Sequence, residues 1–252
     1  MYKTFFNSLG DALRAGGISL HRLGTRLQGN YAYVEQLNRH SRIAPFKDVV
    51  PFVGQSTFVA PNSAVIGDVS LGKNSSVWYN CVLRGDVNSI IIGDETTIGD
   101  RSVIHVANHG PQGEQATVIG NRVYIGPGAI IHGAEIQDGA YIGAGSIVYD
   151  GSVMEKNSIL EAGSLLTSGK KVKEGEVWGG SPAKFIRNIT DKECEKVNKL
   201  VDDNVALSEE HDVEQSKSAK QIFLDQVNLN STRRTRPDYL ILSDKYNKNQ
   251  DK

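Results

Sequence analysis

Ile136-Gln-Asp-Gly-Ala-Tyr-Ile142-Gly-Ala-Gly-Ser-Ile-Val148-Tyr-Asp-Gly-Ser-Val-Met154 carries an aliphatic residue or methionine at every sixth position. The spacing continues through Leu160 and Leu166 to Val172. It also recurs earlier in the chain, at Val53, Val59, Val65, Leu71, Val77 and Leu83, at Ile92, Ile98 and Ile104, and at Ile119, Ile125 and Ile131. Helices repeat apolar residues at three and four positions and half-buried strands repeat them at two, so the period of six indicates a hexapeptide solenoid.

The hexads predict an all-β fold, a left-handed parallel β-helix over residues 51–175. Each hexad supplies one short strand and a corner, three hexads complete a triangular coil, and the arrays together give about six coils. The aliphatic residue points into the prism. A small residue four places later fills the space near the corner, at Thr57, Ser63, Ser75, Cys81, Thr96, Ser102, Ala129, Ala140, Ser146, Ser152, Ser158 and Ser164.

Composition narrows the classes of function. The net charge is −1 and no basic stripe follows the repeats, which argues against a nucleic-acid binder held by phosphate contacts. Cys81 and Cys194 form neither a disulfide framework nor a thiolate metal motif. No apolar run approaches the roughly 18 residues that cross a bilayer, so we expect a soluble or peripheral protein.

Residues 1–50 lack the hexad and predict an amphipathic arm. Apolar residues recur at helical spacing, at Phe5, Phe6, Leu9, Leu13, Leu20, Leu23 and Leu27. Basic residues exceed acidic ones, with Lys3, Arg14, Arg22 and Arg26 against Asp11. Such an opening is typical both of a mitochondrial targeting segment and of a docking arm, and composition leaves both open.

Residues 176–210 predict a closing segment followed by a helix. Thr190 and Glu193 form a capping box, so a helix should run over residues 191–207 and fold back along the prism. One face of this helix would carry Cys194, Val197, Leu200 and Val201. The polar, irregular residues 211–252 predict an extended tail that partners order.

Two histidines are the candidate metal ligands. His105 and His132 each follow an inward isoleucine, so both should point out of the prism on the same face. If residues 107–118 are an inserted loop, three hexads separate the two histidines. They would then lie on adjacent strands, about 4.8 Å apart, where two imidazoles can share one metal ion.

Four segments are distinctive: Arg84-Gly-Asp86 after Trp78-Tyr-Asn-Cys-Val-Leu83, Ile104-His105, Ile125-Gly-Pro-Gly-Ala-Ile-Ile-His132-Gly, and Gly175-Glu-Val-Trp-Gly-Gly-Ser-Pro-Ala-Lys184. They resemble segments of gamma-class carbonic anhydrases, and most closely those of the mitochondrial branch that forms a heterotrimer on respiratory complex I. In front of the repeats, His21-Arg-Leu-Gly-x-Arg-Leu-Gln-Gly29 and Glu35-Gln-Leu-x-Arg-His40 resemble the N-terminal arm of that branch. The resemblance covers roughly residues 15–200.

The resemblance implies a zinc site at a trimer interface, with two histidines from one subunit and one from its neighbour. His105 and His132 match the same-subunit pair, whereas Pro127 stands at the third-ligand position. The Asn-x-Gln pair that positions solvent at the zinc falls on Thr97 and Gly99. A swung-in His109 could replace the third ligand, although a Gly-Pro loop supports it poorly.

We therefore expect a structural, carbonic-anhydrase-like subunit of complex I, on the matrix side of the mitochondrial inner membrane. The resemblance implies that Arg84 and Asp86 form contacts between adjacent subunits. Alternatively, the two residues are only charged residues at a corner of the prism. Zinc would bind only at an interface that a neighbouring subunit completes. An active zinc-dependent carbonic anhydrase and a hexapeptide acyltransferase are the alternatives. The expected partners are related chains in a heterotrimer, membrane-arm subunits and the membrane surface, with no nucleic acid.

Overall fold

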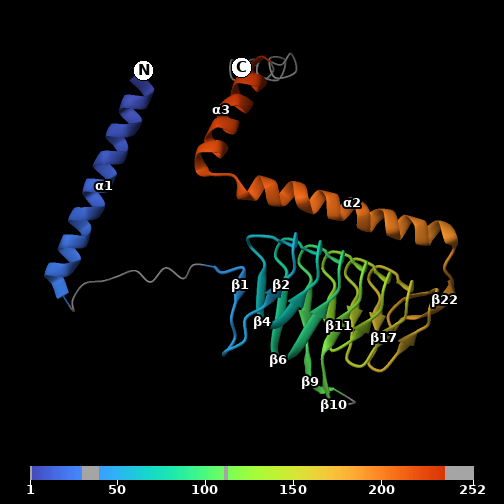
Figure 1. The fold of residues 1–252 in the computed structure, drawn as a ribbon. Helices are drawn as coiled ribbons and strands as arrows, with labels where there is room; N and C mark the ends of the chain where they lie inside the picture. Colours follow the sequence, from blue (N-terminus) through green and yellow to red (C-terminus); the bar gives the residue numbers. More distant parts are fainter. Residues whose placement is uncertain (1, 30–39, 111–112, 236–252) are drawn as a thin grey trace, which may run out of the picture. The chain divides into compact units, whose positions relative to one another are not determined.

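The computed structural model describes residues 2–29, 40–110 and 113–235. It confirms the left-handed parallel β-helix: short strands coil into a prism, and a long helix, α2, runs along it (Figure 1). Two compact units, Met1–His40 and Ser41–Lys252, make up the chain. Each unit is described by itself.

The prism has three faces, called here faces 1, 2 and 3. Face 1 contains β1 (Ile43–Ala44), β8 (Val103–His105), β13 (Ile130–His132), β16 (Ile147–Val148) and β19 (Leu165–Leu166). Face 2 contains β2 (Phe52–Val53), β11 (Thr117–Ile119), β14 (Glu135–Ile136), β17 (Val153–Met154) and β20 (Lys171–Val172). Two longer strands, β4 (Ala64–Leu71) and β6 (Val82–Ile92), bend around the corner and join both faces into a 12-stranded sheet.

Face 3 is a separate 8-stranded sheet. Its strands are β3 (Phe58–Val59), β5 (Ser76–Val77), β7 (Thr97–Ile98), β12 (Tyr124–Ile125), β15 (Tyr141–Ile142), β18 (Ile159–Leu160), β21 (Glu176–Gly179) and β22 (Lys184–Asn188). Only β22 pairs antiparallel in this sheet, where it closes the end of the solenoid.

The core is a set of inward columns. Ile131 pairs with Ile104 of one neighbouring coil and Val148 of the other, and all three side chains are buried. The small corner residues also bond the backbone of the next coil: Ser75 Oγ donates to the Gly93 carbonyl at 2.7 Å, and Ser146 Oγ donates to the Glu161 carbonyl at 2.9 Å. These hydroxyls satisfy carbonyls that the corners would otherwise bury unpaired.

The solenoid is longer at both ends than residues 51–175. At its start, β1 pairs in parallel with β4, although the turn around Phe46 and Val49 interrupts the spacing of six. At its end, Trp178 pairs with Leu160 and packs against the core, six positions after Val172. An aromatic residue in an aliphatic column hides this last strand from the hexad pattern.

The insertion that the sequence predicts at residues 107–118 is present, although its last two residues, Thr117 and Val118, already belong to strand β11 of the prism. It holds an antiparallel hairpin of β9 (Ala107–Gly110) and β10 (Gly113–Gln115). The chain then rejoins the prism at β11, which pairs with β6 in parallel. The hairpin therefore leaves the count of hexads between His105 and His132 intact.

Helix α2 (Asp191–Ser216) begins at the predicted capping box but continues past residue 207. The Thr190 amide donates to Glu193 Oε2 at 3.0 Å. Near the far end, His211 Nδ1 and Gln215 Nε2 each lie 2.8 Å from the Tyr79 hydroxyl. These contacts hold the last turns of α2 against face 3. A capping box marks the start of a helix and gives no signal of contacts near its end.

The predicted extended tail from residue 211 is wrong for residues 211–235. Helix α2 covers residues 211–216, and α3 (Ala219–Thr235) follows after a short break. Ion pairs of Lys217 with Glu214 and Asp225 link the two helices across the break. Residues 236–252 lie outside the described part of the chain.

In the N-terminal unit, residues of the predicted arm form α1 (Tyr2–Gln28), as their helical spacing predicts.

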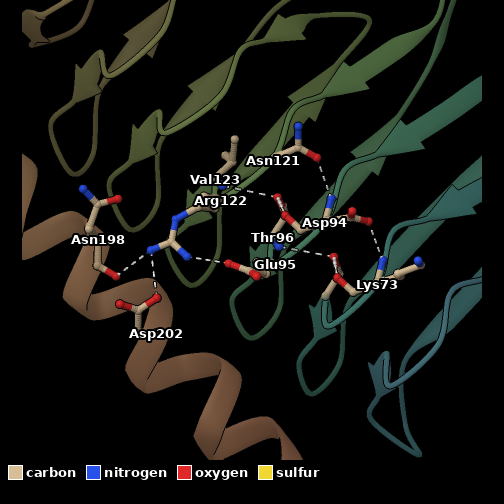
Figure 2. A network of polar contacts seen from close by, with 10 residues as sticks. Lys73, Asp94, Glu95, Thr96, Asn121, Arg122, Val123, Asn198 and Asp202 are labelled. Atoms are coloured by element: carbon tan, nitrogen blue, oxygen red, sulfur yellow. Dashed lines mark hydrogen bonds and ion pairs between the residues drawn. The ribbon is translucent and has the colours of Figure 1, made fainter.

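An arginine at a corner holds α2 against face 3 (Figure 2). Arg122 forms an ion pair with Glu95 through Nη1, and its Nη2 lies 2.8 Å from Asp202 Oδ1 on α2. Nη2 also donates to the Asn198 carbonyl at 3.4 Å. Because Glu95 and Asp202 come from the prism and the helix respectively, one guanidinium joins both.

Candidate functional site

The predicted histidine pair forms on face 1. His132 pairs with His105 in register across β13 and β8, and their ring centroids lie 5.0 Å apart. Each ring follows a buried isoleucine and points outward, with side-chain exposures of 20% for His105 and 33% for His132. The solenoid thus brings together two residues that lie far apart in the sequence.

His105 is hydrogen-bonded to the carboxylate of Asp86, which also forms an ion pair with Arg84. His105 Nε2 lies 3.1 Å from Asp86 Oδ1, and Arg84 Nε lies 3.3 Å from Asp86 Oδ2. Burial acts to raise the Asp86 pKa, but the hydrogen bond from His105 and the charge of Arg84 outweigh it and lower the pKa. Asp86 is therefore an ionised acceptor, and Nε2 of His105 carries the proton.

His132 has a carboxylate partner that sequence reasoning missed. Its Nδ1 is bonded to Asp150 Oδ1. Asp150 lies 18 residues after His132, which is one coil, so coil spacing around each candidate ligand could have found it. A neutral ring that donates to its carboxylate, from Nε2 of His105 or from Nδ1 of His132, has its other nitrogen as an acceptor, which is the state in which imidazole binds metals.

Backbone contacts fix the strands that carry the pair. Thr117 Oγ1 donates to the His105 carbonyl at 2.5 Å and accepts from the Gly133 amide at 3.1 Å. The Gly133 amide also lies 3.2 Å from the His105 carbonyl. Thr117, the first residue of β11 after the insertion, therefore links the backbones next to both histidines.

Pro127, Thr97 and Gly99 lie together, but away from the histidines of the same chain. Thr97 is buried on face 3, and all three residues line a cavity of about 160 Å³ with Asn204 and Leu207 of α2. A Cβ on Gly99 would lie 2.7 Å from the Pro127 nitrogen, so position 99 carries no side chain without a shift of the next coil.

Within the described residues, no group of three or more His, Cys, Asp or Glu side chains is placed to hold a metal ion. The side chain of His109 lies outside that description, so its predicted role as a substitute ligand stays a prediction.

Cys81 is buried and donates its thiol to the Gly99 carbonyl at 3.0 Å, and burial raises its pKa to about 11. This cysteine is a core residue.

Comparison with known proteins decides the family. A family model described as bacterial transferase hexapeptide (six repeats) matches residues 116–149. An uncharacterized protein of Dictyostelium discoideum is 53% identical over 95% of this chain and 97% of its own length. Gamma carbonic anhydrase 3, mitochondrial, of Arabidopsis thaliana is 44% identical over 96% of this chain and 94% of its own length. The chain belongs to the gamma carbonic anhydrase family.

A solved structure agrees on the fold. The crystal structure of a hexapeptide transferase family protein from Anaplasma phagocytophilum superimposes with a TM-score of 0.62 and 46% sequence identity. It covers 66% of this chain and 95% of the bacterial one. Within the described residues, no helix combines the length and apolar character needed to cross a membrane.

Proposed function

We propose that this member of the gamma carbonic anhydrase family is a structural subunit of mitochondrial respiratory complex I, the NADH:ubiquinone oxidoreductase, without a full catalytic site of its own. It would join related chains in a heterotrimer on the matrix side of the membrane arm, peripheral to the inner membrane. The observation that supports a structural role is the presence of proline at position 127. A proline at the position of the third zinc ligand offers no side-chain donor atom to a metal.

The loss of one ligand limits the chemistry. A catalytic zinc needs three protein ligands and an open fourth position, at which the metal activates solvent for attack on carbon dioxide. Among the described residues, His105 and His132 have no third ligand beside them, and a side chain at Gly99 would require a shift of the coil that carries Pro127. A homotrimer would repeat this incomplete set at every interface, so we expect it to be inactive.

Two observations support the proposal that this chain is part of complex I. Relatives that match most of this chain, gamma carbonic anhydrases 1, 2 and 3 of Arabidopsis thaliana, are named mitochondrial. The segments at residues 21–29 and 35–40 resemble the N-terminal arm of the complex I branch, and the first of them closes helix α1.

We propose further that zinc is held only at an interface that a neighbour completes. His105 and His132 would bind it together with a histidine from an intact related chain. The interface at which this chain supplies Pro127 would bind none. Arg84 and Asp86, which are paired beside His105, would stabilise contacts between subunits at the same edge.

One observation favours a second candidate, an active zinc-dependent enzyme that interconverts carbon dioxide and bicarbonate. The histidine pair is intact, and each ring is bonded to a carboxylate, Asp86 or Asp150. Carboxylate-bound imidazoles are common among metal ligands because the carboxylate fixes the ring and raises its basicity. An acyltransferase has less support, since only the shared repeat points to it.

Purification of the full chain alone separates the two candidates. Zinc content per chain and carbon dioxide hydration would be measured beside a His105→Ala/His132→Ala double variant that cannot bind zinc through the pair. The structural proposal predicts no hydration above the double variant. Stoichiometric zinc with hydration that the double variant abolishes would establish the enzyme instead.

A further inference from the structure

Helix α1 has a continuous leucine side. Leu9, Leu13, Leu20, Leu23 and Leu27 follow one another at steps of four, seven, three and four residues, which places them on one side of an α-helix. In the structure their side chains are exposed, from 45% for Leu9 to 80% for Leu27. A row of exposed leucines of this length is a surface that water solvates poorly.

The opposite side of α1 is basic. Arg14, His21, Arg22 and Arg26 lie there together with Asp11, which is the only acidic residue within Tyr2–Gln28. One apolar residue, Ile18, also lies on this side and is 48% exposed. The helix therefore pairs a leucine face with a positively charged face.

We infer that helix α1 binds the surface of an anionic lipid bilayer, with its leucine side in the acyl boundary and its arginines at the headgroups. An interfacial helix has this combination of a strong apolar face, a cationic polar face and low net hydrophobicity. Long arginine side chains can reach lipid phosphates from a helix whose opposite side is buried. Helix α1 lacks the apolar character that a helix needs to cross a bilayer.

The charge pattern favours lipid over a helical protein partner. A helix that packs into a protein seam carries complementary acidic and basic residues beside its apolar stripe. In α1 the positions beside the leucines are Gly10, Gly17 and Gly24 on one flank, and Ala12 and Ser19 on the other. They offer no opposite charges to a partner helix, whereas the arginines match an anionic membrane.

Vesicle flotation of the purified full chain tests this inference. The chain should float with vesicles of phosphatidylcholine and cardiolipin, float far less with phosphatidylcholine alone, and detach as salt screens the charges. Leu20→Glu should lower partitioning roughly tenfold to hundredfold, because a buried leucine is lost from the acyl boundary. Ile18→Glu is the matched control, since it places the same charge two residues away on the headgroup side.

Three outcomes would overturn the inference. The first is a chain that does not float with cardiolipin vesicles, and the second is an equal loss of flotation in Leu20→Glu and Ile18→Glu. The third is a mature chain from mitochondria whose N-terminus lacks α1, which would make this helix a removed targeting segment. The inference rests on α1 alone, so the hydration measurement on the solenoid can fail without affecting it.

Discussion

His105 and His132 occupy equivalent positions on neighbouring coils of the prism, with their rings 5.0 Å apart and a carboxylate bonded to each. The β-helix maintains this relationship through backbone register, since the two residues pair directly across parallel strands. Pro127 lies on a different edge of the prism, where it lines a cavity together with Gly99 and residues of α2. A change at position 127 therefore leaves the histidine pair undisturbed.

Zinc occupancy in a heterotrimer should be asymmetric. Pro127→His restores the donor that this chain lacks and should add zinc at its interface without restoring turnover, because Thr97 and Gly99 still leave solvent at the metal poorly oriented. His132→Ala should remove zinc from the other interface. Metal analysis of both variants in the purified heterotrimer checks this prediction. Equal zinc at every interface, or zinc unchanged by His132→Ala, would contradict it.

The inward columns should carry much of the stability. Ile92→Ala should lower the free energy of unfolding by about 2–4 kcal/mol, because it leaves a cavity in a packed core. Ile91→Ala makes the same chemical change one residue earlier and should cost at most about 1 kcal/mol. The reason is exposure, which is 2% for Ile92 and 46% for Ile91. Urea unfolding of both variants measures the difference, and equal costs would refute the inward assignment.

Arg122 should hold helix α2 on face 3. Arg122→Ala removes the ion pairs with Glu95 and Asp202 and should destabilise the docked helix by about 1 kcal/mol, as half-exposed pairs do. Arg101→Ala is the control, since Arg101 is exposed and its backbone has a similar left-handed φ of 60°, against 54° for Arg122. Hydrogen exchange in α2 should rise in the first variant only. Similar exchange in both would show that the ion pairs do not hold the helix.

Acid should weaken the start of helix α2. The bidentate contact with Arg187 and the bonds from Thr190 lower the Glu193 pKa from 4.5 to about 2. The stabilisation from Glu193 is therefore present above pH 4.5 and is lost as the pH falls towards about 2. Glu193→Gln should be less stable than the parent chain at neutral pH, and the difference should disappear in strong acid. Glu195→Gln, an exposed neighbour, should show no such convergence in unfolding followed by circular dichroism.

The sequence was sufficient to predict the solenoid and the histidine pair, because both follow from one period. Every inward position must be apolar to fill the prism, so the hexad marks nearly every strand and fixes which residues are neighbours. The prediction failed where other contacts decide the structure. Trp178 fills an aliphatic column with an aromatic ring, and β1 pairs with β4 without the hexad spacing.

Helix α2 shows why the rest was hidden. Its start carries a local signal, the capping box of Thr190 and Glu193, but its length depends on distant contacts. His211 and Gln215 meet the Tyr79 hydroxyl, and the His211 ring lies 5.0 Å from Trp78. Such pairings follow from the path of the helix along face 3, which the sequence pattern does not specify. The bond between Asp150 and His132 is different, since coil spacing alone could have revealed it.

Affinity purification of the tagged full chain from gently solubilised mitochondrial membranes tests the central claim most directly. Complex I subunits and related gamma carbonic anhydrase chains should co-purify in fixed proportions. An equally tagged matrix enzyme that is not part of any membrane complex would serve as the control. Recovery of the chain as a free trimer of identical subunits, with no complex I subunit above that control, would contradict the account.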